Sequence, residues 1–125
     1  MPQAEILLYN FTDDERTRLL RRYLNKSKIT HHTIRTPEFL HPLGYLFAIP
    51  GFNPCAQFNL GGNFTDEMLV MKDFSNEQLD DFLDFFKKNN LAPVALKAIL
   101  TPVNQTWNSL QLHAELLEER AAMDK

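Results

Sequence analysis

The segment from Met68 to Trp107 constrains the fold of this chain more than any other. It contains a short apolar run, a stretch with the apolar period of a helix, and a second run rich in Val, Ile and Leu. The first run, Met68–Met71, is too short for a helix, and the second, Pro93–Leu100, ends at a Thr-Pro pair that interrupts strand pairing. The segment therefore predicts a strand, a helix and a second strand.

The predicted helix has a start signal and a stop signal. Ser75 is a strong N-cap, and Gln78 stands three residues later, where it completes a capping box. Asn89 and Asn90 follow the helix, and an Asn at this boundary tolerates a left-handed backbone. The spacing predicts that one stripe of the helix is buried, at Leu79, Phe82, Leu83 and Phe86.

The start of the chain repeats this order of elements. Glu5–Phe11 holds consecutive apolar residues, as in a central strand that is covered on both faces. Thr12 is predicted to cap a helix that ends near Asn25, with Glu15 completing a capping box. Lys28–Thr36 combines β-branched residues with polar ones, so we expect it at an edge of the sheet.

A less regular connection joins the two halves. Residues 39–49 have the apolar spacing of one or two buried helical turns, and Gly44 would allow a close backbone approach there. Residues 50–66 form an irregular insertion rich in Phe, Pro and Gly. After the second half, Asn108 is predicted to cap a final helix, with Gln111 three residues on. The aromatic residues of the insertion are too apolar for a free linker, so we expect all three to dock on this domain or a neighbour: Phe52, Phe58 and Phe64.

We predict one mixed α/β (α+β) domain over residues 1–125. The element order favours a split β-α-β, ferredoxin-like sheet of about four strands with three main helices. A small three-layer, mostly parallel sheet is the alternative. Ile6–Tyr9 and Met68–Met71 need cover on both faces, which the final helix, the Phe-rich insertion or a second subunit would supply. The prediction therefore includes a homodimer or another protein partner.

The composition of the chain limits the classes of function that we expect and predicts its cellular compartment. The formal net charge of -3 argues against a nucleic-acid-binding protein. The charge is uneven, because residues 1–36 hold seven Lys/Arg and four Asp/Glu, whereas residues 37–125 hold six and twelve. A single cysteine, Cys55, fits a reducing compartment, and no apolar run approaches the ~20 residues of a membrane helix. With no signal-peptide pattern either, we expect a cytoplasmic protein without a membrane partner.

The chain carries no catalytic signature. His31 and His32 are adjacent, so on a strand they point to opposite faces and do not predict a metal site together with His41. The residues around Cys55 supply neither a base nor a positive charge that would activate a thiol. The sequence also lacks a glycine-rich phosphate loop. We therefore expect no enzymatic activity, no metal and no cofactor.

The turn from Thr101 to Asn108 is the best candidate site in the sequence. It surrounds a helix N-terminus with hydroxyls and amides, and free amides at such a terminus bind anions or polar ligands. The alternative is that the polar residues only cap and brace the turn while the tryptophan fills core. The candidate ligand-binding residues are Thr101, Asn104, Thr106, Trp107 and Asn108.

A second candidate is a basic patch on the first helix, formed by Arg18, Arg21, Arg22 and Lys26. Such a patch would contact phosphate or an acidic partner. The simpler interpretation is a solvated helix face, because the chain as a whole is acidic.

Several segments follow one pattern: Leu-Gly-Tyr-Leu at Leu43–Leu46, Met-Leu-Val-Met-x-x-Phe-Ser from Met68, and a Leu-Lys-Ala…Thr-Pro-x-Asn-x-x-Trp segment at Leu96–Trp107. A leucine- and glutamate-rich helix follows them. Together they resemble a small bacterial family, domain of unknown function 3783, over most of the chain. The resemblance implies an uncharacterised bacterial cytoplasmic protein and carries no activity. We expect a non-catalytic protein-association module, with a small-molecule or anion-binding regulatory domain at Thr101–Asn108 as the alternative.

Overall fold

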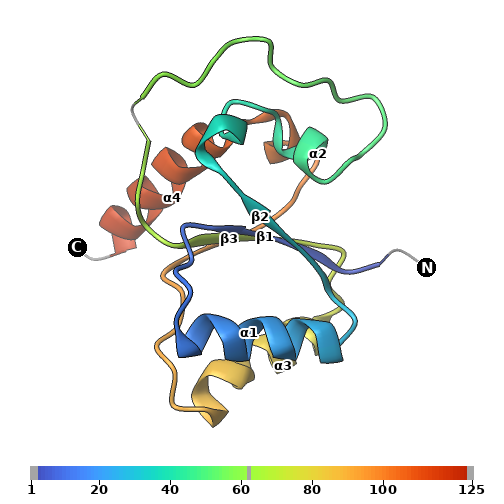
Figure 1. Cartoon of the computed structure of the whole chain (residues 1–125), viewed down its shortest axis with the longest axis vertical. Helices are drawn as coiled ribbons and strands as arrows, with labels where there is room; N and C mark the ends of the chain where they lie inside the picture. Colours follow the sequence, from blue (N-terminus) through green and yellow to red (C-terminus); the bar gives the residue numbers. More distant parts are fainter. Residues whose placement is uncertain (1–2, 62, 124–125) are drawn as a thin grey trace.

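The computed structural model of the protein describes residues 3–61 and 63–123. Two strand-helix-strand units follow one another along the chain, separated by a long connection, and a final helix completes the fold (Figure 1). The elements are β1 (Glu5–Tyr9), α1 (Glu15–Lys26), β2 (Thr30–Ile34), the 3-10 turn η1 (Thr36–Glu38), α2 (Leu43–Leu46), β3 (Met68–Lys72), α3 (Asn76–Lys88), β4 (Leu96–Ile99), the 3-10 turn η2 (Asn104–Thr106) and α4 (Ser109–Met123).

The four strands form one open sheet in the order β2-β1-β3-β4. β1 pairs with β2 in parallel, and so does β3 with β4, whereas the central strands β1 and β3 are antiparallel, with Leu7 opposite Val70. The predicted mixed α/β class with about four strands is confirmed. The ferredoxin-like arrangement is not confirmed, because the split unit has a strand inserted between its two parallel strands, and here those strands are direct neighbours.

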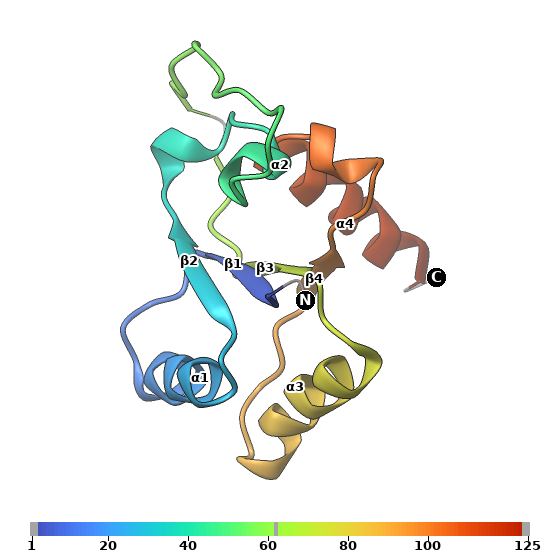
Figure 2. The ribbon, with the colours of Figure 1, turned by 90° about the vertical axis from the view of Figure 1, so that its right-hand side faces the viewer.

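Helices cover both faces of the sheet, so the molecule has three layers (Figures 1 and 2). α1 and α3 lie on one face, and α2 and α4 lie on the other. The side chains of β1 alternate between the layers, since Ile6 and Leu8 pack with α1 and α3 while Leu7 and Tyr9 pack on the other side. Three layers match the alternative architecture, although the central strand pair is antiparallel. α1, α3 and α4 are the three main helices, and the short α2 falls within residues 39–49, where one or two helical turns were predicted.

Both central strands find their cover within one chain. Leu112 of α4 and Phe64 of the insertion are buried against the α2/α4 side of the sheet, so a second subunit is not needed there. Phe52 packs over Gly44, where a Cβ would lie 2.6 Å from the Phe52 ring, which explains the glycine. Phe58 does not dock on this domain, since it is 86% exposed, and its docking on a neighbour stays a prediction.

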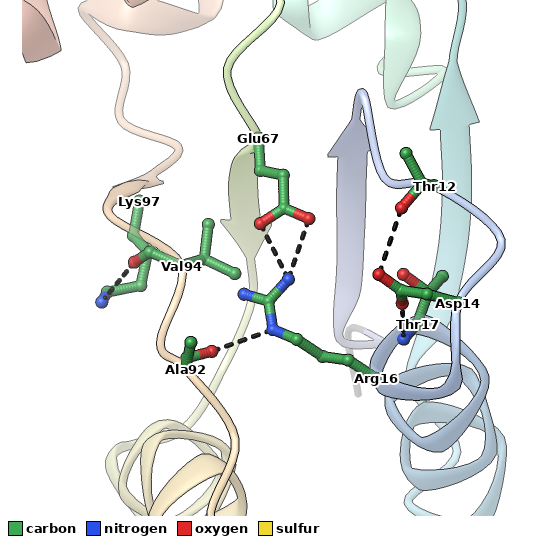
Figure 3. A network of polar contacts seen from close by, with 8 residues as sticks. All are labelled: Thr12, Asp14, Arg16, Thr17, Glu67, Ala92, Val94 and Lys97. Atoms are coloured by element: carbon green, nitrogen blue, oxygen red, sulfur yellow. Dashed lines mark hydrogen bonds and ion pairs between the residues drawn. The ribbon is translucent and has the colours of Figure 1, made fainter.

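Local signals set the ends of the helices. Ser75 and Gln78 form the predicted capping box of α3, and Asn90 has the left-handed φ of 54° after its end. α1 begins later than predicted, because the Asp14 carboxylate, not the Thr12 hydroxyl, accepts the Thr17 amide at 2.8 Å (Figure 3). The buried stripe of α3 is also rotated from the prediction, since Phe85 is buried and Leu83 is exposed.

Arg16 connects α1 to the segments that precede β3 and β4, the two strands in the other half of the sheet. Its Nη1 donates to both carboxylate oxygens of Glu67 at 2.8 Å, and its Nε donates to the Ala92 carbonyl at 2.9 Å (Figure 3). Its guanidinium also lies 5.8 Å from the centre of the Phe11 ring and 5.9 Å from that of Phe86. This half-buried ion pair fixes the segments that lead into β3 and β4.

Candidate functional site

A groove runs along β4, the strand at one edge of the sheet. Its volume of about 440 Å³ is within the range of ligand sites. One wall comes from α3 and the other from α4, and the turn after β4 closes one end. The lining residues are Met71, Leu79, Leu83, Lys97, Ala98, Ile99, Thr101, Val103, Asn104, Trp107, Leu112, Glu115, Leu116 and Glu119.

The backbone of β4 offers open hydrogen-bonding groups in this groove. The Leu100 amide donates to the Met71 carbonyl at 2.8 Å, and alternate residues of a strand bond to the same neighbour. The main-chain groups of Lys97 and Ile99 therefore face away from β3. Side chains occupy the outward carbonyls at both ends, since Asn104 donates to Ile99 at 3.1 Å and Arg120 donates to Ala95 at 3.4 Å. Among partners in the described residues, none bonds to the two main-chain groups of Lys97 or to the amide of Ile99, so these groups are open on the edge.

The rim of this edge is apolar. Ile99 is 52% exposed, Val103 is 67% exposed, and Leu83 of α3 lies on the same rim. β2, at the other edge of the sheet, carries the side chains of His31, His32 and Thr33 instead. Polar and charged residues on an edge strand discourage pairing with another chain, and β4 has one such residue, Lys97, among its four.

The groove is lined by both positively and negatively charged side chains. The Lys97 ammonium donates to the Val94 carbonyl at 2.8 Å (Figure 3). Partial burial, and then the nearby Arg120 guanidinium, lower the pKa of Lys97 below its ordinary value. Glu115 and Glu119 of α4 lie on the opposite wall. The groove therefore has an apolar floor with one cation and two carboxylates around it.

The predicted turn forms the closed end of the groove, to which Thr101, Asn104 and Trp107 contribute. Asn104 is nearly buried, and its side chain accepts the Thr101 amide at 2.8 Å while donating to Ile99. Its own amide donates to the Thr101 hydroxyl at 3.0 Å. These contacts favour the bracing interpretation, and direct ligand binding by the turn stays a prediction.

The two other predicted residues of the turn also make internal contacts. The Thr106 hydroxyl donates to the Val103 carbonyl at 3.0 Å. Asn108 caps α4 as predicted, because its carboxamide oxygen accepts the Gln111 amide at 2.9 Å and the Gln111 side chain accepts the Asn108 amide at 2.8 Å. The Gln111 amide at the start of α4 is therefore already bonded to the Asn108 side chain, and an anion bound at this helix start would need that amide.

The basic patch lies on α1, away from the groove. Arg18, Arg22 and Lys26 are exposed, whereas Arg21 is half-buried with Nη2 3.4 Å from the Thr33 hydroxyl. The structure thus places these residues beside β2 and does not bring them together with the turn. Their contact with a phosphate or an acidic partner stays a prediction.

One constellation that the sequence analysis missed is the pair His113 and Asp66, with 2.8 Å between Nε2 and Oδ2. Ser109 stands one helical turn before His113, which suggests a hydrolytic triad. However, Ser109 is fully buried, and its hydroxyl lies 2.7 Å from the Tyr9 hydroxyl, so no substrate reaches it. His41 accepts the Cys55 amide at 2.9 Å through Nδ1. Within the described residues, no group of three His, Cys, Asp or Glu side chains has the placement of a metal site.

Comparison with known proteins concerns the second half of the chain. Residues 67–123 match the model of a family described as a domain of unknown function, DUF3783. The predicted resemblance is confirmed over this range, which leaves Leu43–Leu46 outside. No curated protein and no solved structure matches the chain. The matched segment contains every residue that lines the groove. In the part of the chain that the structure describes, no helix has the length and apolarity needed to cross a membrane.

Proposed function

We propose that this protein is a non-catalytic protein-association module that binds an extended segment of a partner along β4. The open main-chain groups of Lys97 and Ile99, set between apolar walls, carry this proposal. An added strand gains affinity from main-chain hydrogen bonds and specificity from side chains that enter the walls at alternate positions. The side chains of Asn104 and Arg120 limit the pairing to the middle of β4.

The setting we propose for this function is the cytoplasm of a bacterium. The family resemblance supports a bacterial origin, and the single cysteine, Cys55, supports a reducing compartment. Self-association as a homodimer or a larger assembly is one form that the association takes, and other proteins are the remaining candidate partners.

Selection from a library of displayed, unstructured peptides tests the proposal. We expect the selected peptides to carry apolar residues at alternate positions and to lose affinity about tenfold or more for the Ile99→Asp variant. A matched control is Leu117→Asp, because Leu117 is 44% exposed on α4 but does not line the groove.

A comparison of two substitutions at Lys97 measures how much the main-chain hydrogen bonds of β4 contribute to peptide binding. Lys97→Pro removes an outward amide without removing a bond to β3, and proline is tolerated on edge strands. Lys97→Ala removes the same side chain but keeps the amide. We expect weaker peptide binding by the proline variant than by the alanine variant. Equal binding by both, or peptides that are indifferent to Ile99→Asp, would refute strand addition at β4.

A small-molecule or anion-binding function is the second candidate, and the place of Thr101, Asn104 and Trp107 at the groove end favours it. A thermal-shift screen with metabolites and oxyanions tests it. A ligand at 100 times its Kd adds about 2.7 kcal/mol of stability. We expect such a ligand to act on wild type and on Thr106→Ala, but not on Val103→Asp, which blocks the groove. A flat screen would leave protein association as the function.

A further inference from the structure

The insertion between α2 and β3 exposes two large apolar side chains that are two positions apart. Phe58 is 86% exposed and Leu60 is 94% exposed. Asn59 between them points back to the protein, where its Nδ2 donates to the Thr36 carbonyl at 2.5 Å and to Asn63 Oδ1 at 2.7 Å. Side chains of an extended chain alternate, so this anchor turns both neighbours of Asn59 outward together.

This pair has the pattern of a strand that a groove would receive. Segment 56–61, which contains it, forms neither helix nor strand, so its main-chain groups do not belong to the sheet. Two large apolar side chains on one side of a short segment match the alternate positions through which an added strand is recognised. Large apolar side chains exposed on one side of a segment are the kind of surface that favours an interaction.

The pair and the groove lie on different sides of the molecule. Segment 56–61 packs near Thr36 and Pro37 of η1, close to the end of β2. β2 and β4 are the two outer strands of the sheet, and in Figure 2 the insertion lies over the β2 side while β4 faces the other way. Segment 56–61 of one molecule therefore does not fill the groove of the same molecule.

Charge favours contact between these two sides. α1 lies below β2 and carries exposed cations, among them Arg18, Arg22 and Lys26. α3 and α4 flank β4 and carry exposed carboxylates, among them Asp84 and Glu119. A basic β2 side and an acidic β4 side attract one another between two copies of the chain.

We propose that the groove along β4 receives the Phe58–Leu60 segment of a second copy of this chain. The proposal rests on the proposed function and names its partner. The Phe58 and Leu60 side chains pack on the apolar rim at Leu83, Ile99 and Val103, and the main chain of the segment bonds to the open groups of β4.

This contact is head-to-tail, because the donor segment and the receiving groove face different ways. Each molecule therefore has two different neighbours. Its groove receives the segment of one neighbour, and its own segment enters the groove of the other. A contact of this type does not close in a dimer and continues into rings or chains. The average mass should consequently rise past that of a dimer as the protein concentration increases.

Sedimentation velocity over a range of concentrations tests the proposal with two complementary variants. Phe58→Ser/Leu60→Ser removes the donor and keeps the groove, whereas Ile99→Asp blocks the groove and keeps the donor. We expect each variant alone to be monomeric at concentrations where wild type associates. An equimolar mixture of the two should form a dimer and nothing larger, since only one productive junction is left.

Two control variants separate this contact from general stickiness. Leu117→Asp removes an exposed apolar residue outside the groove, and Gln57→Ser changes an exposed polar residue beside Phe58. Both should associate like wild type, within about twofold in Kd, which corresponds to about 0.4 kcal/mol. Circular dichroism of all variants checks that each is folded.

Several results would overturn the proposal. A wild-type protein that stays monomeric at millimolar concentration rules it out, as does a mixture of the two variants that does not form a dimer. If such a monomeric protein still binds library peptides in the groove, self-association fails and the proposed function stands. If the groove binds neither the peptides nor a second copy, both fail.

Discussion

Asn104 is the residue that holds the closed end of the groove. Its carboxamide bonds to the Thr101 amide and to the Ile99 carbonyl, and it is nearly buried. We expect Asn104→Ala to lower the free energy of unfolding by about 2–3 kcal/mol, because two main-chain groups lose their partner. Urea denaturation measures this change.

Two substitutions serve as controls for Asn104→Ala. Asn104→Asp keeps an oxygen that accepts the Thr101 amide but buries a charge and sets its second oxygen against the Ile99 carbonyl, so it should cost at least as much as Asn104→Ala. Thr106→Ala removes an exposed hydroxyl that bonds to Val103, and its effect should be below about 1 kcal/mol. An Asn104→Ala variant as stable as Thr106→Ala would show that the turn does not depend on this brace.

Tyr9 makes the stability of the protein sensitive to high pH. Burial raises the pKa of its hydroxyl well above 10, and the nearby Glu38 carboxylate acts in the same direction, against the hydrogen bond with Ser109. In the unfolded chain the hydroxyl ionises near pH 10. The stabilisation by neutral Tyr9 is therefore complete below pH 10 and is lost as the pH rises above it.

Chemical denaturation between pH 8 and pH 11 tests this prediction on the Tyr9→Phe variant. At neutral pH the variant should be less stable by about 1–2 kcal/mol, because the buried Ser109 hydroxyl loses its partner. Its free energy of unfolding should then fall less steeply above about pH 10 than that of wild type. Parallel curves for the two proteins would mean that Tyr9 does not control the alkaline slope. The pKa of Tyr23, raised by burial and by its bond to Asp81, contributes to both curves.

Residue-scale features were predictable where the signal is local. Ser75 and Gln78 stand at the fixed spacing of a capping box, and the structure shows that box. Thr12 has the same pattern with Glu15, yet Asp14 lies closer to the helix and is the stronger acceptor. Leu83 lies on the border of the apolar stripe of α3, and it is exposed because the open edge at β4 leaves that border uncovered.

At the scale of elements, α2 depends on close contact with the insertion. Gly44 lets Phe52 approach to a distance at which a Cβ would clash. We expect Gly44→Ala to lower the free energy of unfolding by about 1–3 kcal/mol, the usual cost of overpacking. Denaturant titration of the single variant measures it.

A second variant gives this prediction its control. If the clash with Phe52 is the cause, Gly44→Ala should cost much less in a Phe52→Ala background, and the two substitutions should not be additive. Additive costs would place the effect in the backbone of α2 instead of in the contact with Phe52.

The elements themselves were largely predictable, whereas their order in the sheet was not. Apolar runs predicted β1 and β3 as central strands, and the polar content of β2 predicted an edge. The same elements build either a split or an adjacent β-α-β unit, because hydrophobic periodicity does not record which strand is the neighbour. The groove was missed for a similar reason, since Leu83 and Ile99 have the sequence pattern of core residues.

For the whole molecule, the two edges of the sheet differ in polarity and charge, which favours a head-to-tail contact between two copies. The β2 edge is polar and lies beside cations, while the β4 edge is apolar and lies between acidic helices. Attraction between exposed charges is screened beyond about 8 Å at physiological ionic strength. We therefore expect added salt to slow association while the apolar contact keeps the complex together, which stopped-flow measurements at several salt concentrations would show. Association rates that do not change with salt would contradict a role for this charge difference.

Amide hydrogen exchange at Lys97 and Ile99, followed by NMR with and without a bound library peptide, tests most directly that β4 accepts an added strand. Strand addition predicts that both amides become protected in the complex while the amides of β2 exchange as before. Unchanged exchange at Lys97 and Ile99 in a peptide-saturated sample would contradict the account, because the peptide would then be bound without using the open edge of β4.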